Sequence, residues 1–225
     1  MFWSALISLT LLILAFSIVL SWLDSDAGRA RLVDAINHSG VVKLQTLQGS
    51  FWSRLEVREL EINTDAALIQ LDRGVLDWTP YSLLLGDLYL NELTLGKLSV
   101  QSKPQAPMQE PSPPPTSLTL PLGVKVLQIN VAQLDISGAP AISDIRASLD
   151  SNGTKHRLSL QQLRLPQGSL SAALNVAGTA PFAAAGSFVL AGQLDGASLT
   201  AVGQFEGNLR ALAVKADLNA AKVSA

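Results

Sequence analysis

A spacing of four apolar residues recurs along this chain as two alternating pairs, with two other residues between the pairs. The four copies are Leu55, Val57, Leu60 and Ile62; Leu88, Leu90, Leu93 and Leu95; Ile129, Val131, Leu134 and Ile136; and Leu158, Leu160, Leu163 and Leu165. Alternation within each pair is typical of a β-strand with one buried face. Because two residues rather than one separate the pairs, the second pair would point to the opposite face of a regular strand. Each copy therefore needs an explanation other than a regular strand.

Each copy can be interpreted as a tight hairpin or as one long strand with a β-bulge. The middle dipeptides contain no Gly, whereas two-residue hairpin turns prefer Asn-Gly or Asp-Gly. A bulge would return all four apolar side chains to one face and bend the strand. We therefore expect a mainly β fold whose antiparallel sheet curls into a groove. An ordinary antiparallel sandwich has the same alternation and stays an alternative.

The first 23 residues predict a transmembrane helix. Phe2 to Leu23 contains no charged residue, and as a helix it would span roughly 33 Å, enough to cross a bilayer. Trp3 and Trp22 would then lie at the two membrane interfaces, where Trp is enriched. A cleaved signal peptide is the competing interpretation, but no Lys or Arg precedes the apolar run.

The rest of the chain divides by composition into four segments. They are a short helix over 24–40, a first β unit over 41–100, a Pro-rich linker over 101–117 and a second β unit over 118–225. Six of the residues from Pro104 to Pro115 are Pro, which central strands exclude. The second unit alternates in short strands separated by turns and is expected to be a truncated meander of a longer protein.

Composition argues against several classes of function. The 225 residues carry 16 basic and 18 acidic side chains, without a basic block, so nucleic acid is not an expected partner. The chain has no Cys, and its two His residues, His38 and His156, are isolated in the sequence. No phosphate-binding Gly-Lys-Ser/Thr motif is present. We expect no enzyme, no catalytic or metal site and no cofactor.

The order of the motifs resembles the N-terminal part of the TamB-like family, within the AsmA-like group of bridge-like lipid transfer proteins. The segments that carry the resemblance are the apolar N-terminal run, Leu47 to Trp52, Leu55 to Ile62, Leu76 to Leu84, the Pro-rich insert and Leu120 to Val126. Relatives in the AsmA-like group share the anchor and the β-repeats. The resemblance implies a single-pass protein of the bacterial inner membrane, with its bulk in the periplasm.

The resemblance also implies a function. TamB-like proteins belong to a translocation and assembly module that supports outer-membrane protein and autotransporter assembly, and they are linked to phospholipid transport between the two membranes. The implied partners are membrane lipids and a TamA-like outer-membrane barrel protein, which would bind a C-terminal region absent from this sequence.

A lipid conduit agrees with the apolar pattern, because an acyl chain needs a continuous apolar surface screened from water. We therefore predict that the sixteen residues of the four copies line a lipid path. In the alternative, these residues fill a closed core and the protein is a structural scaffold or tether that carries no lipid.

Overall fold

The structure is a computed structural model that describes residues 2–103, 117–194, 197–208 and 211–222. It begins with two helices, α1 (Phe2–Leu23) and α2 (Asp26–His38). α1 covers the predicted apolar run, but no helix among the described residues is long and apolar enough to cross a membrane. The prediction of a transmembrane anchor is therefore not confirmed. Trp22 is 47% exposed, while the side chain of Trp3 lies outside the described part, so both interface assignments stay predictions.

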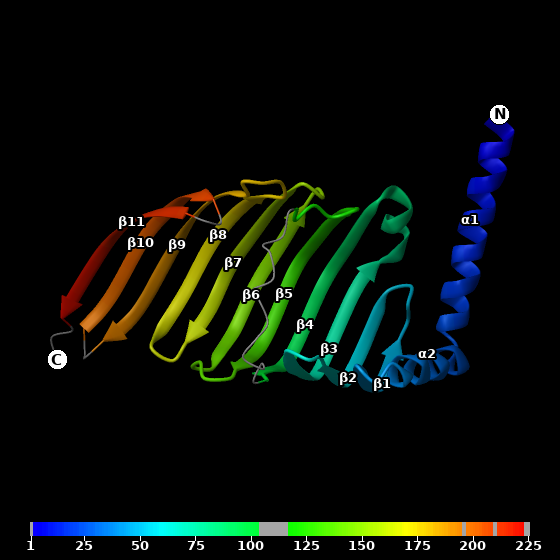
Figure 1. The fold of residues 1–225 in the computed structure, drawn as a ribbon, viewed down its shortest axis with the longest axis horizontal. Coiled ribbons are helices and arrows are strands. Elements are labelled where there is room, and N and C mark those ends of the chain that lie inside the picture. The colour runs from blue at the N-terminus through cyan, green and yellow to red at the C-terminus, as the bar shows by residue number, and fades with distance from the viewer. Residues whose placement is uncertain (1, 104–116, 195–196, 209–210, 223–225) are drawn as a thin grey trace.

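The remaining described residues are mainly β. The strands are β1 (Val42–Gly49), β2 (Arg54–Asn63), β3 (Ala67–Thr79), β4 (Asp87–Ser102), β5 (Gly123–Ile136), β6 (Ile142–Ser151), β7 (Lys155–Leu165), β8 (Gly168–Ala177), β9 (Ala183–Leu194), β10 (Ala197–Asn208) and β11 (Ala211–Lys222). A short 3-10 helix, η1 (Pro80–Leu85), connects β3 to β4. The strands form one sheet in which each lies beside its sequence neighbours (Figure 1). The expected mainly β fold is confirmed, and the sandwich alternative is wrong.

The expectation of an antiparallel sheet is wrong at one place, because β4 and β5 run parallel. A parallel pair needs a crossover of a dozen residues or more, and the chain between Ser102 and Gly123 provides it. The predicted linker starts inside β4, whose last residues are Gln101 and Ser102, and most of it lies outside the described residues. The two predicted β units are therefore parts of one continuous sheet.

Each copy of the apolar spacing lies within a single strand, namely β2, β4, β5 or β7, so the hairpin interpretation is wrong. In β2 the backbone at Glu59 has a φ of 51°, the left-handed conformation that accompanies some bulges. In β7 the register with β8 shifts between Leu160 and Leu163. In β4 the register with β3 shifts by one residue at Asn91. The predicted bulges are therefore confirmed in β4 and β7, whereas the phase shift at Glu59 leaves the register of β2 with β1 and β3 unchanged.

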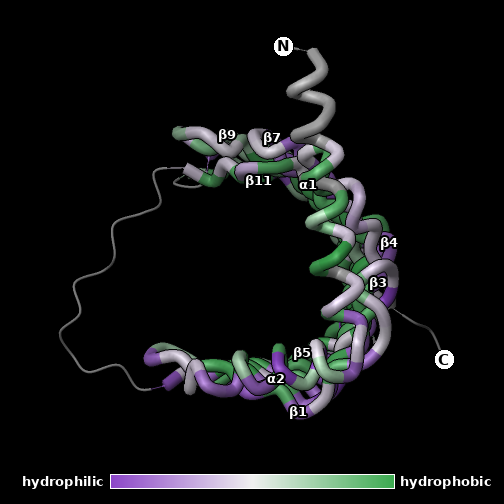
Figure 2. Tube along the Cα trace, turned by 90° about the vertical axis from the view of Figure 1, so that its right-hand side faces the viewer, coloured by the Kyte–Doolittle hydropathy of each residue, from purple (hydrophilic) through white to green (hydrophobic). Residues whose placement is uncertain are grey.

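The phase shifts also align from strand to strand. Regular pairing is interrupted at Gln45, Glu59 and Asp72, which lie opposite one another in β1 to β3, and at Gly96 and Ala132, which lie opposite each other in β4 and β5 and one residue away from that line. At each of these positions two consecutive side chains point to the polar face of the strand. The polar face is therefore longer than the apolar face, and the strand bends toward its apolar face. β4 and β5 have a second interruption, at Asn91 and Leu127. These bends curl the sheet into an open trough with a C-shaped cross-section (Figure 2).

One end of the sheet is closed by α2, which packs beside β1. The side chain of Asn37 accepts a hydrogen bond from the Leu44 N–H at 2.7 Å and donates one to the Leu44 carbonyl at 3.1 Å. The Asn37 amide thus makes the two hydrogen bonds that a neighbouring strand would make with Leu44 at this free edge. Unpaired backbone groups at a sheet edge can otherwise pair with another chain and lead to aggregation. The expected short helix over 24–40 is present, with Ser25 as its N-cap.

Candidate functional site

The apolar side of the trough, which we call the inner face, is lined by rows of side chains that cross the strands. The longest row contains Leu55, Leu76, Leu93, Ile129, Ala147, Leu160, Ala172, Phe188, Gly203 and Ala216, one from each strand from β2 to β11. Residues at paired positions of neighbouring strands point to the same face of a sheet. An apolar surface therefore runs without interruption along nearly the whole sheet.

The sixteen predicted lining residues all belong to rows of this face. The second and third copies lie on adjacent strands, with Leu93 paired to Ile129 and Leu98 paired to Leu134. The second pair of one copy is thus beside the first pair of the next, so the copies are not aligned with one another. β3 separates the first copy from the second, and β6 separates the third from the fourth. The inner-face position of these residues is a finding, while their contact with lipid stays a prediction.

Sequence reasoning missed the lining residues of β3, β6 and β8 to β11. In β3 they are Ile69, Leu71, Gly74 and Leu76, which have the same spacing as the four copies. Gly74 occupies the third apolar position and concealed the pattern. A Cβ at Gly74 would lie 2.8 Å from Val57 Cγ2 and 3.1 Å from Leu71 Cδ2. The side chains of Val57 and Leu71 therefore both lie over Gly74 on the inner face, although they come from opposite sides of the bend.

No second layer covers the inner face within the part of the chain that the structure describes. Apart from neighbouring strands, the elements that pack extensively on one another are α1 with α2, α2 with β1, and η1 with β4. Leu158 and Ile136 are accordingly 37% and 39% exposed, although both belong to inner-face rows. Most domains bury the apolar face of a sheet against another layer, and large exposed apolar patches mark interaction sites. This uncovered face is the candidate functional site.

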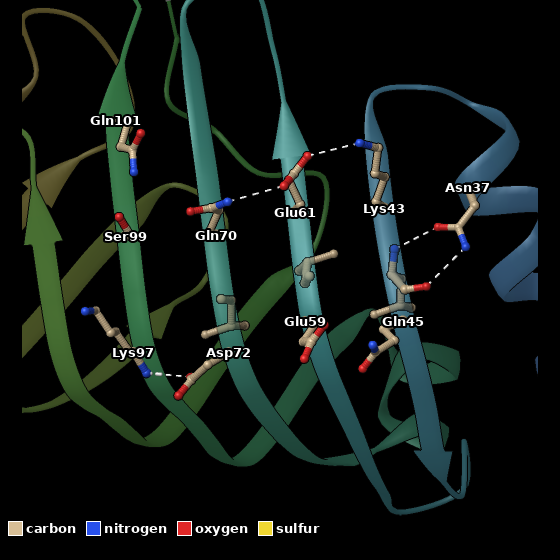
Figure 3. Close-up of a pocket in the computed structure, with 13 residues that line it drawn as sticks. Asn37, Lys43, Gln45, Glu59, Glu61, Gln70, Asp72, Lys97, Ser99 and Gln101 are labelled. Carbon is tan, nitrogen blue, oxygen red and sulfur yellow. Dashed lines mark hydrogen bonds and ion pairs between the residues drawn. The ribbon is translucent and has the colours of Figure 1, made fainter.

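The opposite, outer face is polar. Figure 3 shows Lys43, Glu61 and Gln70 on the viewer's side of β1 to β3, with later strands of the sheet passing behind them. Lys43 Nζ and Gln70 Nε2 each lie 3.3 Å from a carboxylate oxygen of Glu61. The apolar side chains consequently point into the curl and the charged ones into water.

Hydrogen bonds and ion pairs stabilise the charged form of outer-face carboxylates. The pKa of Glu61 lies below its usual value because Gln70 and then Lys43 donate to it. The pKa of Glu56 is lowered by a hydrogen bond from Arg58 and by the charges of Arg73 and Arg58. Lys43, Arg58 and Arg73 are solvent-exposed and the two carboxylates are partly exposed, so we expect modest contributions to stability.

The outer face also has a shallow depression of about 880 Å³ over β1 to β4. Asn37, Lys43, Glu61, Asp72 and Lys97 are among its lining residues (Figure 3). Asp72 accepts a hydrogen bond from the Lys97 backbone N–H at 2.6 Å, and Lys97 Nζ lies 3.0 Å from Asp135. Because its charges of both signs pair with one another, this depression is typical of a solvated surface.

Comparison with known proteins gave one finding. The family model described as TamB, N-terminal domain, matches residues 18–185, three quarters of the chain. The comparisons with curated proteins and with solved structures gave no match. The matched region starts within α1 and extends into β9.

Proposed function

This chain belongs to the TamB N-terminal domain family, and on that basis we propose that its trough carries the acyl chains of phospholipids between the two membranes of a Gram-negative cell envelope. Family membership indicates a membrane-associated periplasmic protein. We further propose that α1 attaches the chain to the inner membrane. Support of outer-membrane protein and autotransporter assembly, together with a TamA-like outer-membrane partner, is the wider context of this proposal.

The observation that carries the proposal is the uncovered inner face. Its rows cross the strands from β1 to β11, so an acyl chain could move along the trough without leaving apolar surface. Apolar contact is favourable by about 25 cal/mol for each Å² removed from water. The trough is also open along one side, and an amphiphile needs this shape because its head group must stay in water while its tails are buried.

The rival proposal is a scaffold that links membrane components and carries no lipid. The two proposals differ in what a charge on the inner face would do. Arg at Leu134 would place a cation beside Leu98 and Ile142, in the path of the tails. Its neighbour Gln133 belongs to a different row, paired with Lys97 and Ser143 on the outer face, and therefore provides a matched control.

We propose to test this by phospholipid transfer between donor and acceptor vesicles. Leu134→Arg should reduce the transfer rate roughly tenfold or more, because an acyl chain cannot solvate the charge, whereas Gln133→Arg should leave the rate unchanged. Circular dichroism and urea unfolding must show that both variants are folded. A folded Leu134→Arg protein with the wild-type transfer rate would favour the scaffold.

A further inference from the structure

The most exposed large apolar side chain among the described residues is at the tip of η1. Leu85 is 86% exposed and Tyr81, in the same short helix, is 49% exposed. Exposed apolar and aromatic side chains that are grouped on one short element are candidates for a contact surface. Neither residue belongs to the inner-face rows, so the proposed lipid path does not explain their exposure.

η1 is held rigidly on the sheet. Pro80, the first residue of this helix, is fully buried. The Ser82 hydroxyl donates to the Thr79 carbonyl at 2.7 Å and accepts the Tyr89 N–H at 3.1 Å. Gly86 ends the helix with a φ of 86°, a conformation that favours glycine. The tip is therefore displayed in a fixed position, without the ordering cost that a flexible loop would incur on binding.

Aromatic residues connect this tip to the end of α1. The ring of Trp52, in the β1–β2 turn, lies 5.2 Å from the ring of Tyr81. The same turn is tied to the segment between the helices, because Asp24 accepts hydrogen bonds from the Ser50 hydroxyl at 2.6 Å and the Phe51 N–H at 2.5 Å. Trp22, the exposed residue near the end of α1, lies two positions before Asp24. We call Trp52, Tyr81 and Leu85 the aromatic tip cluster.

The cluster is also continuous with the trough. β3 ends at Thr79, and its inner-face residue Trp78 pairs with Leu90 of β4. Leu88, three residues after Leu85, begins the inner-face rows of β4. A lipid tail that meets Leu85 is therefore within a few residues of the proposed path.

From these observations we propose that the aromatic tip cluster inserts into the head-group region of a lipid bilayer and places the trough against the membrane that supplies its lipid. This inference rests on the proposed function. The chemistry favours a bilayer because Trp and Tyr combine a flat apolar ring with a polar N–H or O–H, which suits the boundary between hydrocarbon and water. Leu85 supplies an aliphatic side chain at the tip. Since the cluster itself is uncharged, it should bind zwitterionic lipid as well as anionic lipid.

A fluorescent probe at Leu85 can test the contact, and the absence of Cys from the chain makes single-site labelling possible. Leu85→Cys, labelled with an environment-sensitive fluorophore, is mixed with phosphatidylcholine vesicles. The matched control is labelled Val202→Cys. Val202 is 50% exposed on the outer face, where it pairs with Val189 and Asp217. Vesicle flotation shows in each case that the protein is bound.

The proposal predicts a blue shift and quenching by head-group spin labels at position 85, with neither effect at position 202. Adding anionic lipid should not change the result.

The proposal would be overturned if position 85 stayed in water while the protein floated with the vesicles, or if its burial required anionic lipid. Phospholipid transfer, measured on the same wild-type protein, separates the two proposals. Transfer with a solvent-exposed position 85 would reject the docking surface and retain the conduit. Burial of position 85 without transfer would reject the conduit and retain the docking surface.

Discussion

Substitution of Gly74 tests whether the bent strands gather their apolar side chains on one face. The Cβ of Ala at this position would lie 2.8 Å from Val57 Cγ2, closer than real contacts allow, and 3.1 Å from Leu71 Cδ2. Val57 cannot easily move away, because branching at Cβ restricts its χ1. Gly74→Ala should therefore strain the inner face.

The size of the effect follows from two opposing terms. Overpacking typically costs about 1–3 kcal/mol, while replacing Gly by Ala stabilises by about 0.4–1 kcal/mol through the unfolded chain. We expect Gly74→Ala to lower the free energy of unfolding by about 1 kcal/mol. In a Val57→Ala background the closer contact is removed and only the end of the flexible Leu71 side chain must shift, so the same substitution should raise the free energy of unfolding by up to about 1 kcal/mol.

Urea unfolding followed by circular dichroism measures all four proteins of this double-mutant cycle. The change of sign between the two backgrounds is the diagnostic result. If Gly74→Ala stabilised the otherwise wild-type protein, Val57 would not lie over residue 74, and the arrangement of the inner face described above would be wrong.

Two further predictions concern the bends and the outer face. Glu59 has a φ of 51°, so Glu59→Gly should leave the free energy of unfolding unchanged or raise it by up to about 1 kcal/mol, and Glu59→Val should lower it; equal urea midpoints for the two variants would contradict this. Hydrogen bonds from Arg58, Gln70 and Gln133 lower the pKa values of Glu56, Glu61 and Asp135, respectively, below their ordinary values in the folded protein. Their contribution to stability is therefore fully present above the unfolded-state pKa values, and it is lost as the pH falls through the folded-state pKa values. Glu56→Gln should lose less stability than wild type between pH 5 and acid pH in urea titrations; the same loss would show that Glu56 does not contribute.

The bulged strands could be predicted because a phase shift is a local property of the sequence. The two residues Arg58 and Glu59 between apolar pairs were enough to predict a bend in β2. In β3 the same shift was not recognised, because Gly74 has no side chain to show which face it occupies. The expected open, curled sheet followed from the shared bends, since strands that bend at corresponding positions curl together.

The pairing of β4 with β5 could not be predicted, because it joins segments separated by the Pro-rich stretch. Local alternation does not specify a strand's neighbour, and the composition change at residue 101 does not reveal that the strands on both sides belong to one sheet. The role of Asn37 was also missed: its two hydrogen bonds to Leu44 depend on where α2 folds back on β1. The exposure of Leu85 likewise depends on the surroundings of η1 rather than on its sequence.

Photo-crosslinking in the living cell tests the central claim most directly. A photoreactive amino acid is placed at Leu134 or Leu163 of the inner face, and, as matched controls, at the adjacent Gln133 or Gln162, whose rows contain the outer-face partners Lys97 and Arg146. A lipid-carrying trough predicts crosslinks to phospholipid from Leu134 and Leu163 but not from Gln133 or Gln162. Equal labelling from both pairs of positions, or no labelling from either, would contradict the conduit.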